Sequence, residues 1–401
     1  MAFDPVLPCE QTEVGGIGFI IAPQVQSIKI TTELDDGTPG KGMIFGNTYT
    51  LEVEKYFHDK KPKNKDEIKW ECTYNTSNGE LAVAGIKEKG DRIKFKVEDV
   101  DLLGKTLTFH AYVGEAREDG ASLNVWVHYR FRWFAYMQFE EGLKARKKNP
   151  QNINQHHTSL CGVAAMMYFF AKDYPDIFYN AFMEFFRTGT SKINQYELQP
   201  NKSLYDMQPV HDNKKYPRYK SSGLMGQTDW IVLAGTRSSD NRNYEGKEGE
   251  DFDAINWVGY IEKMAKQFYE INEVITEITY SPPIVRRNSF IDTIWTAFME
   301  IDKLFNNGYH ILILIDADML NNVVSTFGCA TQYHWISYLG GLKINEKQYT
   351  FNYYCYAAEK MSITFAKKVV ESNFYGYVAF LKRTVTDSAA PINGMPKETN
   401  V

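Results

Sequence analysis

The sequence predicts a multidomain chain in which an all-β sandwich precedes an α+β domain. The first part alternates apolar and polar residues in short stretches, with turn residues about every eight to twelve positions, as in β-sandwiches. The second part begins with helical patterns and ends with strand-like ones, an order typical of α+β proteins. A basic run that ends at Pro150 separates the two. We therefore divide the chain into a lead-in (1–24), the sandwich (25–131), a linker (132–150), the α+β domain (151–383) and a flexible tail (384–401).

Alternation of side chains defines the expected strands of the sandwich. Tyr49, Leu51 and Val53, for example, place apolar side chains on one face of a strand. Strands are expected at 25–32, 49–56, 68–74, 81–86, 92–97, 107–113 and 123–130. The histidines of this part are isolated from one another, so we expect no catalytic cluster here.

The second domain switches from a helical to a strand pattern near residue 310. Ile177, Phe178, Ala181 and Phe182 form one apolar face at helical spacing. Helices are expected at 160–172, 176–187, 228–235, 254–269 and 289–306, and strands at 273–280, 310–316, 333–342, 349–356 and 375–382. The long polar segment 190–222 is expected to line or cover a cleft.

The overall composition is that of an ordinary globular protein. Apolar residues make up 43% and charged residues 24% of the 401 residues. A net charge of −5 and an isoelectric point of about 6.0 argue against nucleic-acid binding. The first residues lack the basic and apolar regions of a signal peptide, and no apolar run is long enough to span a membrane. We expect a protein made in the cytoplasm without a cleaved signal.

The five cysteines do not form a metal-binding pattern. They are scattered, with no Cys-x-x-Cys or Cys/His ligand spacing; they are Cys9, Cys72, Cys161, Cys329 and Cys355. The adjacent pair His156-His157 would point its rings apart, and the segment 316–318 lacks an EF-hand frame. We therefore expect neither a metal ion nor a cofactor.

Cys161 stands out because a polar run ends there and an apolar helical pattern begins. A cysteine at a helix N-terminus is favoured as the reactive thiolate by the partial positive charge of the helix end. Gln155 lies six residues earlier, where its amide could fold back beside the sulfur. His334 lies far downstream in a strand-like run. A Gln and a Cys early in a domain, with a His late in it, is the arrangement of papain-like cysteine hydrolases.

These residue types suggest roles in amide hydrolysis. Cys161 would be the nucleophile, His334 its base, and Gln155 an oxyanion donor. Asn352 is the candidate for orienting the histidine, and its rivals are Tyr354, Tyr356 and Glu359. Cys329 and Cys355 are expected to be structural. The simpler alternative is that Cys161 is a small buried apolar residue at a helix start.

At these positions the chain resembles the papain-like (peptidase C39-like) cysteine hydrolase domains of toxins and secretion-system effectors of Gram-negative bacteria. The matching segments are 154–165, 228–234 with Arg237, Ser239 and Asn241 behind it, 333–336 and 374–378. The resemblance implies the nucleophile, base and oxyanion roles for Cys161, His334 and Gln155. Relatives often carry Trp-Gly after the strand that follows the histidine, whereas this chain has Tyr-Ala-Ala-Glu at 356–359.

The N-terminal part resembles the Ig-like modules that precede toxin domains in Bacteroidota proteins. The two resemblances together imply a type VI secretion effector of interbacterial competition, delivered into a target cell. Its implied partners are a cognate immunity protein, the secretion machinery or an adaptor that binds the Ig-like domain, and a peptide or peptidoglycan substrate.

We therefore predict an antibacterial effector whose Cys161/His334 dyad cleaves an amide bond, in a peptidoglycan peptide or in a target protein. Two alternatives remain at this stage: a catalytically inactive binding protein, and acyltransferase or transglutaminase chemistry at the same dyad. A catalytic Cys161 is expected to react with iodoacetamide at mildly acidic pH much faster than Cys72 or Cys355.

Overall fold

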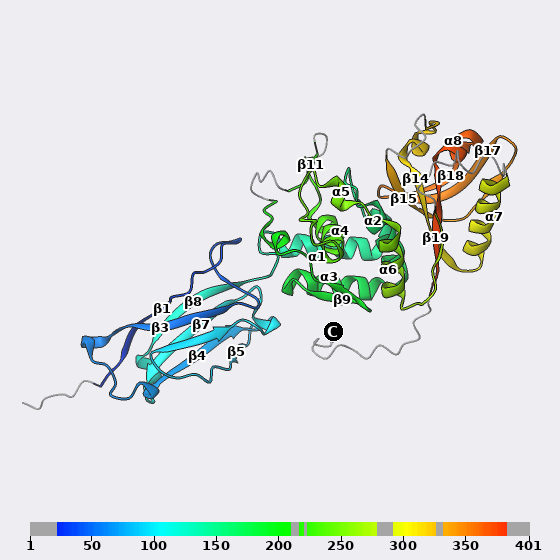
Figure 1. The fold of residues 1–401 in the computed structure, drawn as a ribbon. Coiled ribbons are helices and arrows are strands. Elements are labelled where there is room, and N and C mark those ends of the chain that lie inside the picture. Colours follow the sequence, from blue (N-terminus) through cyan, green and yellow to red (C-terminus); the bar gives the residue numbers. More distant parts are fainter. Residues whose placement is uncertain (1–21, 210–215, 220–222, 279–291, 326–331, 383–401) are drawn as a thin grey trace, which may run out of the picture. The chain divides into compact units, whose positions relative to one another are not determined.

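The structure is a computed structural model that describes residues 22–209, 216–219, 223–278, 292–325 and 332–382 (Figure 1). The predicted lead-in up to residue 21, Cys9, Cys329 and the predicted tail 384–401 lie outside the described residues.

The chain folds as two compact units. The first comprises residues up to Asp35 and Lys41–Val127, and the second comprises Asp36–Gly40 and His128 onward. The short segment 36–40 belongs to the second unit, where Thr38 donates its backbone N–H to the carbonyl of Arg132 at 3.1 Å.

The first unit consists of two antiparallel sheets. Three strands form one sheet in the order β1 (Val25–Ile30), β3 (Thr48–Tyr56), β6 (Arg92–Lys96). Five form the other, in the order β2 (Met43–Ile44), β8 (Ala121–His128), β7 (Thr106–Val113), β4 (Ile68–Asn75), β5 (Leu81–Ala84). Phe95 of the first sheet packs edge-to-face on Phe109 of the second, with ring centroids 4.9 Å apart, so the inner faces share a core.

The segment 132–150, predicted to be a linker, is instead part of the second unit. Helix α1 (Tyr136–Lys148) occupies most of it and buries Phe139 and Leu143 completely. Arg146 lies in the basic run that ends at Pro150 and forms a bidentate ion pair with the buried Asp229, at 3.0 and 2.8 Å. The apolar residues on one face of this segment, rather than its charges, decide its structure.

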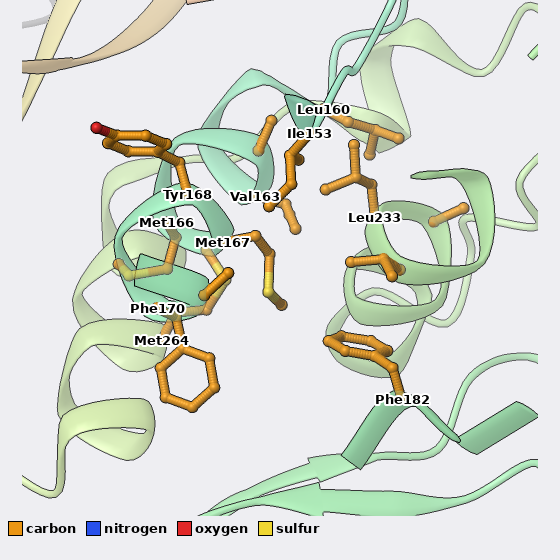
Figure 2. Packing of buried hydrophobic residues seen from close by; sticks show 14 of the residues in the cluster. Ile153, Leu160, Val163, Met166, Met167, Tyr168, Phe170, Phe182, Leu233 and Met264 are labelled. Carbon is orange, nitrogen blue, oxygen red and sulfur yellow. The ribbon is translucent and has the colours of Figure 1, made fainter. Parts of the chain in front are cut away.

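Helices form the first half of the second unit. They are α2 (Cys161–Asp173), α3 (Pro175–Thr188), α4 (Gln227–Asp240), α5 (Asp251–Ala254) and α6 (Val258–Tyr269). Small hairpins lie between them: β9 (Ser191–Ile193) with β10 (Tyr196–Leu198), and β11 (Arg218–Tyr219) with β12 (Gly223–Leu224). Figure 2 shows the core around α2, where Val163, Met167 and Phe170 pack with Leu233 and Met264 from other helices. Helix α2 is apolar on every side because it is buried on every side.

A curled antiparallel sheet forms the second half of this unit (Figure 1). Its strand order is β13 (Ile275–Ile278), β19 (Phe374–Leu381), β14 (Tyr309–Asp316), β15 (Tyr333–Tyr338), β17 (Gln348–Cys355), β16 (Lys343–Ile344), and β18 (Ala358–Ala366) also pairs with β17. Two further helices are α7 (Asp292–Asn306) and α8 (Lys367–Asn373).

The sheet has an apolar core on each of its two faces. In β14, Leu312 and Leu314 join the core formed with α2 and its neighbouring helices. Ile311 and Ile313 join a separate core with α7. The strands therefore carry apolar residues at consecutive positions, as expected for a sheet covered on both sides.

The predicted mixed α+β architecture is confirmed, with N-terminal β-sheets, central helices and a C-terminal antiparallel sheet. Further details differ from the prediction. The expected helix 254–269 is interrupted by an extended segment at 255–257, between α5 and α6. Strand β18 was not predicted, because it is largely exposed and lacks a regular alternation of apolar residues. Helix α8 was not predicted either.

Candidate functional site

Cys161 is the first residue of α2, as the sequence predicts. Its side chain is almost fully enclosed, with 5% of the residue exposed. The backbone N–H groups of Trp335, Gly162 and Cys161 itself lie near enough to the sulfur to lower its pKa. The thiol therefore sits where a helix start meets the backbone of β15, one residue beyond His334.

Burial and hydrogen bonding act in opposite directions on this thiol. Burial raises the pKa of Cys161, the three N–H groups lower it, and the net result is a pKa of about 11. The expected thiolate is thus not the resting form at neutral pH. Cys161 does lie at a helix N-terminus, but the loss of hydration on burial raises its pKa more than the helix end and the N–H groups lower it.

His334 lies on β15 and does not point toward α2. Neighbouring residues of a strand face opposite sides of a sheet. Ser337 faces α2, because its hydroxyl donates to the carbonyl of Ala165 at 3.2 Å, and Ile336 lies in the opposite core. His334, two residues from Ile336, therefore belongs to the face opposite α2.

The imidazole of His334 is hydrogen-bonded to Cys355. Its Nε2 lies 3.0 Å from Cys355 Sγ, and its ring stacks on Tyr356 with centroids 4.8 Å apart. Burial lowers the pKa of His334 to about 4, so the ring is neutral at pH 7. The structure thus brings His334 together with a cysteine that the sequence had assigned a structural role.

Cys355 is the last residue of β17 and is as enclosed as Cys161, at 5% exposure. Burial raises its pKa strongly, and the charge of the nearby Cys161 thiolate raises it further. No motif surrounds Cys355 in the sequence. Its proximity to His334 depends on the pairing of β15 with β17, which one sequence does not specify.

Gln155 is buried just before α2, but its amide is engaged. Its Nε2 donates to the carbonyl of Thr158 at 2.9 Å, and Thr158 Oγ1 donates back to the carbonyl of Gln155 at 2.6 Å. The side chain therefore stabilises the turn that leads into the helix and uses one of its two N–H groups there.

Asn352 lies too far from His334 to orient it. Leu339 donates its N–H to the carbonyl of Asn352 at 2.9 Å, so Asn352 is paired five residues beyond His334 along β15. Five strand residues span about 17 Å. Asn352 Oδ1 instead accepts from the backbone of Ser362 at 2.7 Å. The orienting role predicted for Asn352 is therefore wrong.

The three alternative candidates for orienting His334 lie in different surroundings. Tyr356 stacks on the His334 ring, as described above. Tyr354 stacks on Tyr168, with centroids 4.1 Å apart, and Glu359 accepts a hydrogen bond from the Tyr168 hydroxyl at 2.5 Å. Of the three, Tyr356 is the one that the described contacts place on the histidine.

The extended segment 255–257 joins the cysteine and histidine elements. The buried Asn256 accepts from the N–H of Val163 through Oδ1 at 3.1 Å, and its backbone carbonyl accepts from Trp335 Nε1 at 2.9 Å. Ser159 donates to Asp251 at 3.4 Å. The sequence pattern predicts a helix through Asn256 and gives no sign of this connection.

Exposed aromatic side chains lie on α5 and on the extended segment that follows it. Phe252 is 73% and Trp257 38% exposed, and their ring centroids are 6.2 Å apart. Trp257 is also 6.2 Å from the ring of Tyr333, which immediately precedes His334. An aromatic surface, defined as Phe252, Trp257 and Tyr333, thus adjoins the candidate site.

The described residues contain no group of three or more His, Cys, Asp or Glu side chains placed to hold a metal ion. Nor does any helix in the described parts of the chain have the length and apolar character to cross a membrane. Comparison of the chain with protein-family models, with curated proteins and with solved structures finds no match.

Proposed function

We propose that the second unit is a thiol-dependent hydrolase in which Cys161 is the nucleophile and His334 the base. The observation that carries the proposal is the position of the Cys161 sulfur, at the start of α2 and near the backbone N–H of Trp335, the residue that follows His334. Donors placed in this way stabilise negative charge on sulfur, and in a neighbouring position they stabilise an oxyanion. The papain-like resemblance of the sequence points to the same class.

Cys161 is a better nucleophile than Cys355 on electrostatic grounds. Nearby backbone N–H groups and a helix end partly offset the effect of burial on the Cys161 thiolate, whereas burial and the neighbouring Cys161 both disfavour the Cys355 thiolate. We assign Cys355 the role of holding His334 in the resting state, through the 3.0 Å hydrogen bond.

The pKa values define the order of proton transfer. At pH 7 the thiol is protonated and the imidazole is neutral. In the described conformation His334 faces Cys355, on the side of the sheet opposite α2, so the proposal requires the start of β15 to rearrange. His334 would then take the proton of Cys161 as the sulfur attacks and give it to the departing amine. The S–C bond forms, the C–N bond breaks, and water then releases the acid from the thioester.

The proposed substrate is a peptide amide, in a peptidoglycan peptide or in a protein of a target cell. The aromatic surface beside the site suits the apolar side chains of a peptide. We further propose that the protein is a secreted antibacterial effector of the type VI kind, with an Ig-like first unit that docks to the delivery machinery and with a cognate immunity protein. The sequence resemblances and the division of the chain into a β unit and an α+β unit support this proposal.

Serine substitutions at the two cysteines test the assignment. Cys161→Ser should abolish both the toxicity of the chain inside a susceptible bacterium and the release of peptides from purified sacculi or a proteome extract, followed by mass spectrometry. Cys355→Ser keeps a hydrogen-bonding partner for His334 and should retain most activity. Full activity of Cys161→Ser would exclude the proposed nucleophile, and loss confined to Cys355→Ser would transfer the role to Cys355.

The enclosure of the site favours one second candidate, a binding protein without catalysis. Cys161, His334 and Cys355 are each 5% exposed or less. A binding protein would retain its effect on cells in both serine variants and would release no product from either substrate pool. Acyl transfer to an amine, rather than to water, would appear in the same mass spectra as a product joined to the amine.

A further inference from the structure

Asn256 carries a buried hydrogen-bond donor that has no partner among the described residues. The residue is 1% exposed, and its Nδ2 is within hydrogen-bond reach of no described acceptor. Buried polar groups are paired in the great majority of cases, because an unpaired one loses its hydration without compensation. Such a group beside a candidate nucleophile points to a ligand that completes it.

The orientation of this amide is fixed by its other contact. The backbone N–H of Val163 can be satisfied only by an acceptor, so the atom 3.1 Å from it must be the oxygen of Asn256. A flipped amide would place two donors against each other. The group without a hydrogen-bond partner is therefore the NH2 group of the amide.

The side chain of Asn256 lies over the first turn of α2, at the residue that follows Cys161. A Cβ atom built on Gly162 would be 2.6 Å from Asn256 Cβ and 3.0 Å from its Oδ1, so the amide packs directly on the residue after the nucleophile. Only glycine allows this close approach. The backbone N–H groups of Cys161 and Gly162 belong to the same turn as the one on which Asn256 packs.

We propose that Asn256 donates its side-chain N–H to the substrate carbonyl oxygen as Cys161 attacks, in the oxyanion role that the sequence had suggested for Gln155. The inference rests on the proposed hydrolase function and deepens it. Gln155 directs its own Nε2 to the carbonyl of Thr158, whereas Asn256 retains a free donor at the same helix start.

Matched acidic variants in the full chain test this role. Asn256→Asp keeps the acceptor for Val163 and the shape of the side chain but removes the donor. Gln155→Glu likewise replaces an amide by a carboxylate before the same helix, so the two variants share the effect of an added charge. Circular dichroism and thermal unfolding would establish that both fold.

The probe is p-nitrophenyl acetate, which needs no knowledge of the natural substrate. Attack by Cys161 forms a thioester and breaks the C–O bond to p-nitrophenolate, and the thiol proton passes to His334. We measure release of p-nitrophenolate and locate the acetyl group by peptide mass spectrometry. Loss of one oxyanion donor should slow acylation of Cys161 about 100-fold in Asn256→Asp, with a clearly smaller loss in Gln155→Glu.

Alkylation by iodoacetamide separates the donor role from the reactivity of the thiol, since alkylation forms no oxyanion. The Cys161 alkylation rates of the two variants should be alike while their acylation rates differ. The role of Asn256 would be overturned if both variants lost the same acylation rate, or if the ratio of the acylation rate to the alkylation rate were the same in both. Either result would leave the hydrolase proposal standing. Failure of the wild-type chain to be acetylated at Cys161 would overturn both.

Discussion

The enclosed sulfur of Cys161 determines how the site responds to pH. Its pKa is raised to about 11, so its thiolate fraction and its alkylation rate should increase by about tenfold per pH unit from pH 7 to 10, without a plateau. Iodoacetamide labelling followed by peptide mass spectrometry measures this rate. Cys72, fully buried with a pKa raised to about 12, is the internal control and should label more slowly. A plateau at or below pH 8 would show instead a resting thiolate, as the sequence alone had suggested.

The position of a single site residue could be predicted only where the residues next to it in the sequence determine that position. Cys161 lies at the junction of a polar run and an apolar helix, and this junction is local. The predictions for Asn352 and Cys355 depended on which residues of β15 and β17 are paired, and one residue of register changes every neighbour across the sheet. Asn256 has no local signal at all, because its partners Val163 and Trp335 are distant in sequence.

At the scale of elements, α1 joins the helical core through an ion pair that can be tested. Asp229 has a side chain 3% exposed, and burial raises its pKa while Arg146 lowers it. Arg146→Ala would leave a buried carboxylate unpaired and should reduce the free energy of unfolding by about 3–5 kcal/mol at pH 7. Because the folded pKa of Asp229 rises further in this variant, the loss should shrink as the pH falls toward 5.

Urea unfolding followed by the helical far-UV signal measures this loss, since the described α-helices all belong to the second unit. Lys144→Ala is the matched control on the same helix. It removes an exposed pair with Glu140, worth about 0.3–0.5 kcal/mol. Equal losses in the two variants would contradict a structural role for α1 and restore the linker interpretation.

Elements with strong periodicity could be predicted, and those defined by tertiary contacts could not. The faces of α3 and α7 specify helices by their own spacing of apolar residues. The segment 132–150 carries Phe139 and Leu143 on one face, but its many charges conceal them. The break at 255–257 arises because Asn256 bonds to two other elements, which override the helical pattern around it.

At the scale of the whole molecule, the sequence predicted a β part followed by an α+β part, because each part has its own periodicity and turn residues. The boundary between the two units differs from the predicted one. The second unit begins at His128, before the basic run, and includes the segment 36–40 from within the first part of the sequence. A contact between segments so far apart in the chain leaves no trace in composition or spacing.

Asp173 links the helical half of the second unit to its sheet and gives the unit a defined response to acid. The carboxylate at the end of α2 contacts His310, at the start of β14, and accepts from Lys382, beyond β19, at 2.6 Å. Burial by itself raises the pKa of Asp173, but His310 and then Lys382 outweigh burial and hold the pKa below its usual range. A carboxyl whose pKa is lower in the folded than in the unfolded chain stabilises the fold at higher pH, and this stability is lost as the pH falls through the folded pKa.

Asp173→Asn should therefore lower the free energy of unfolding at pH 7 and make it vary less between pH 5 and about 2 than in the wild type. Denaturant unfolding at a series of pH values measures both effects. The neighbouring Asp176 is the control, because its pair with Lys147 is on the surface and its side chain is 79% exposed. Asp176→Asn should retain the wild-type slope, and an Asp173→Asn variant that also retained it would show that the acid response of the second unit arises elsewhere.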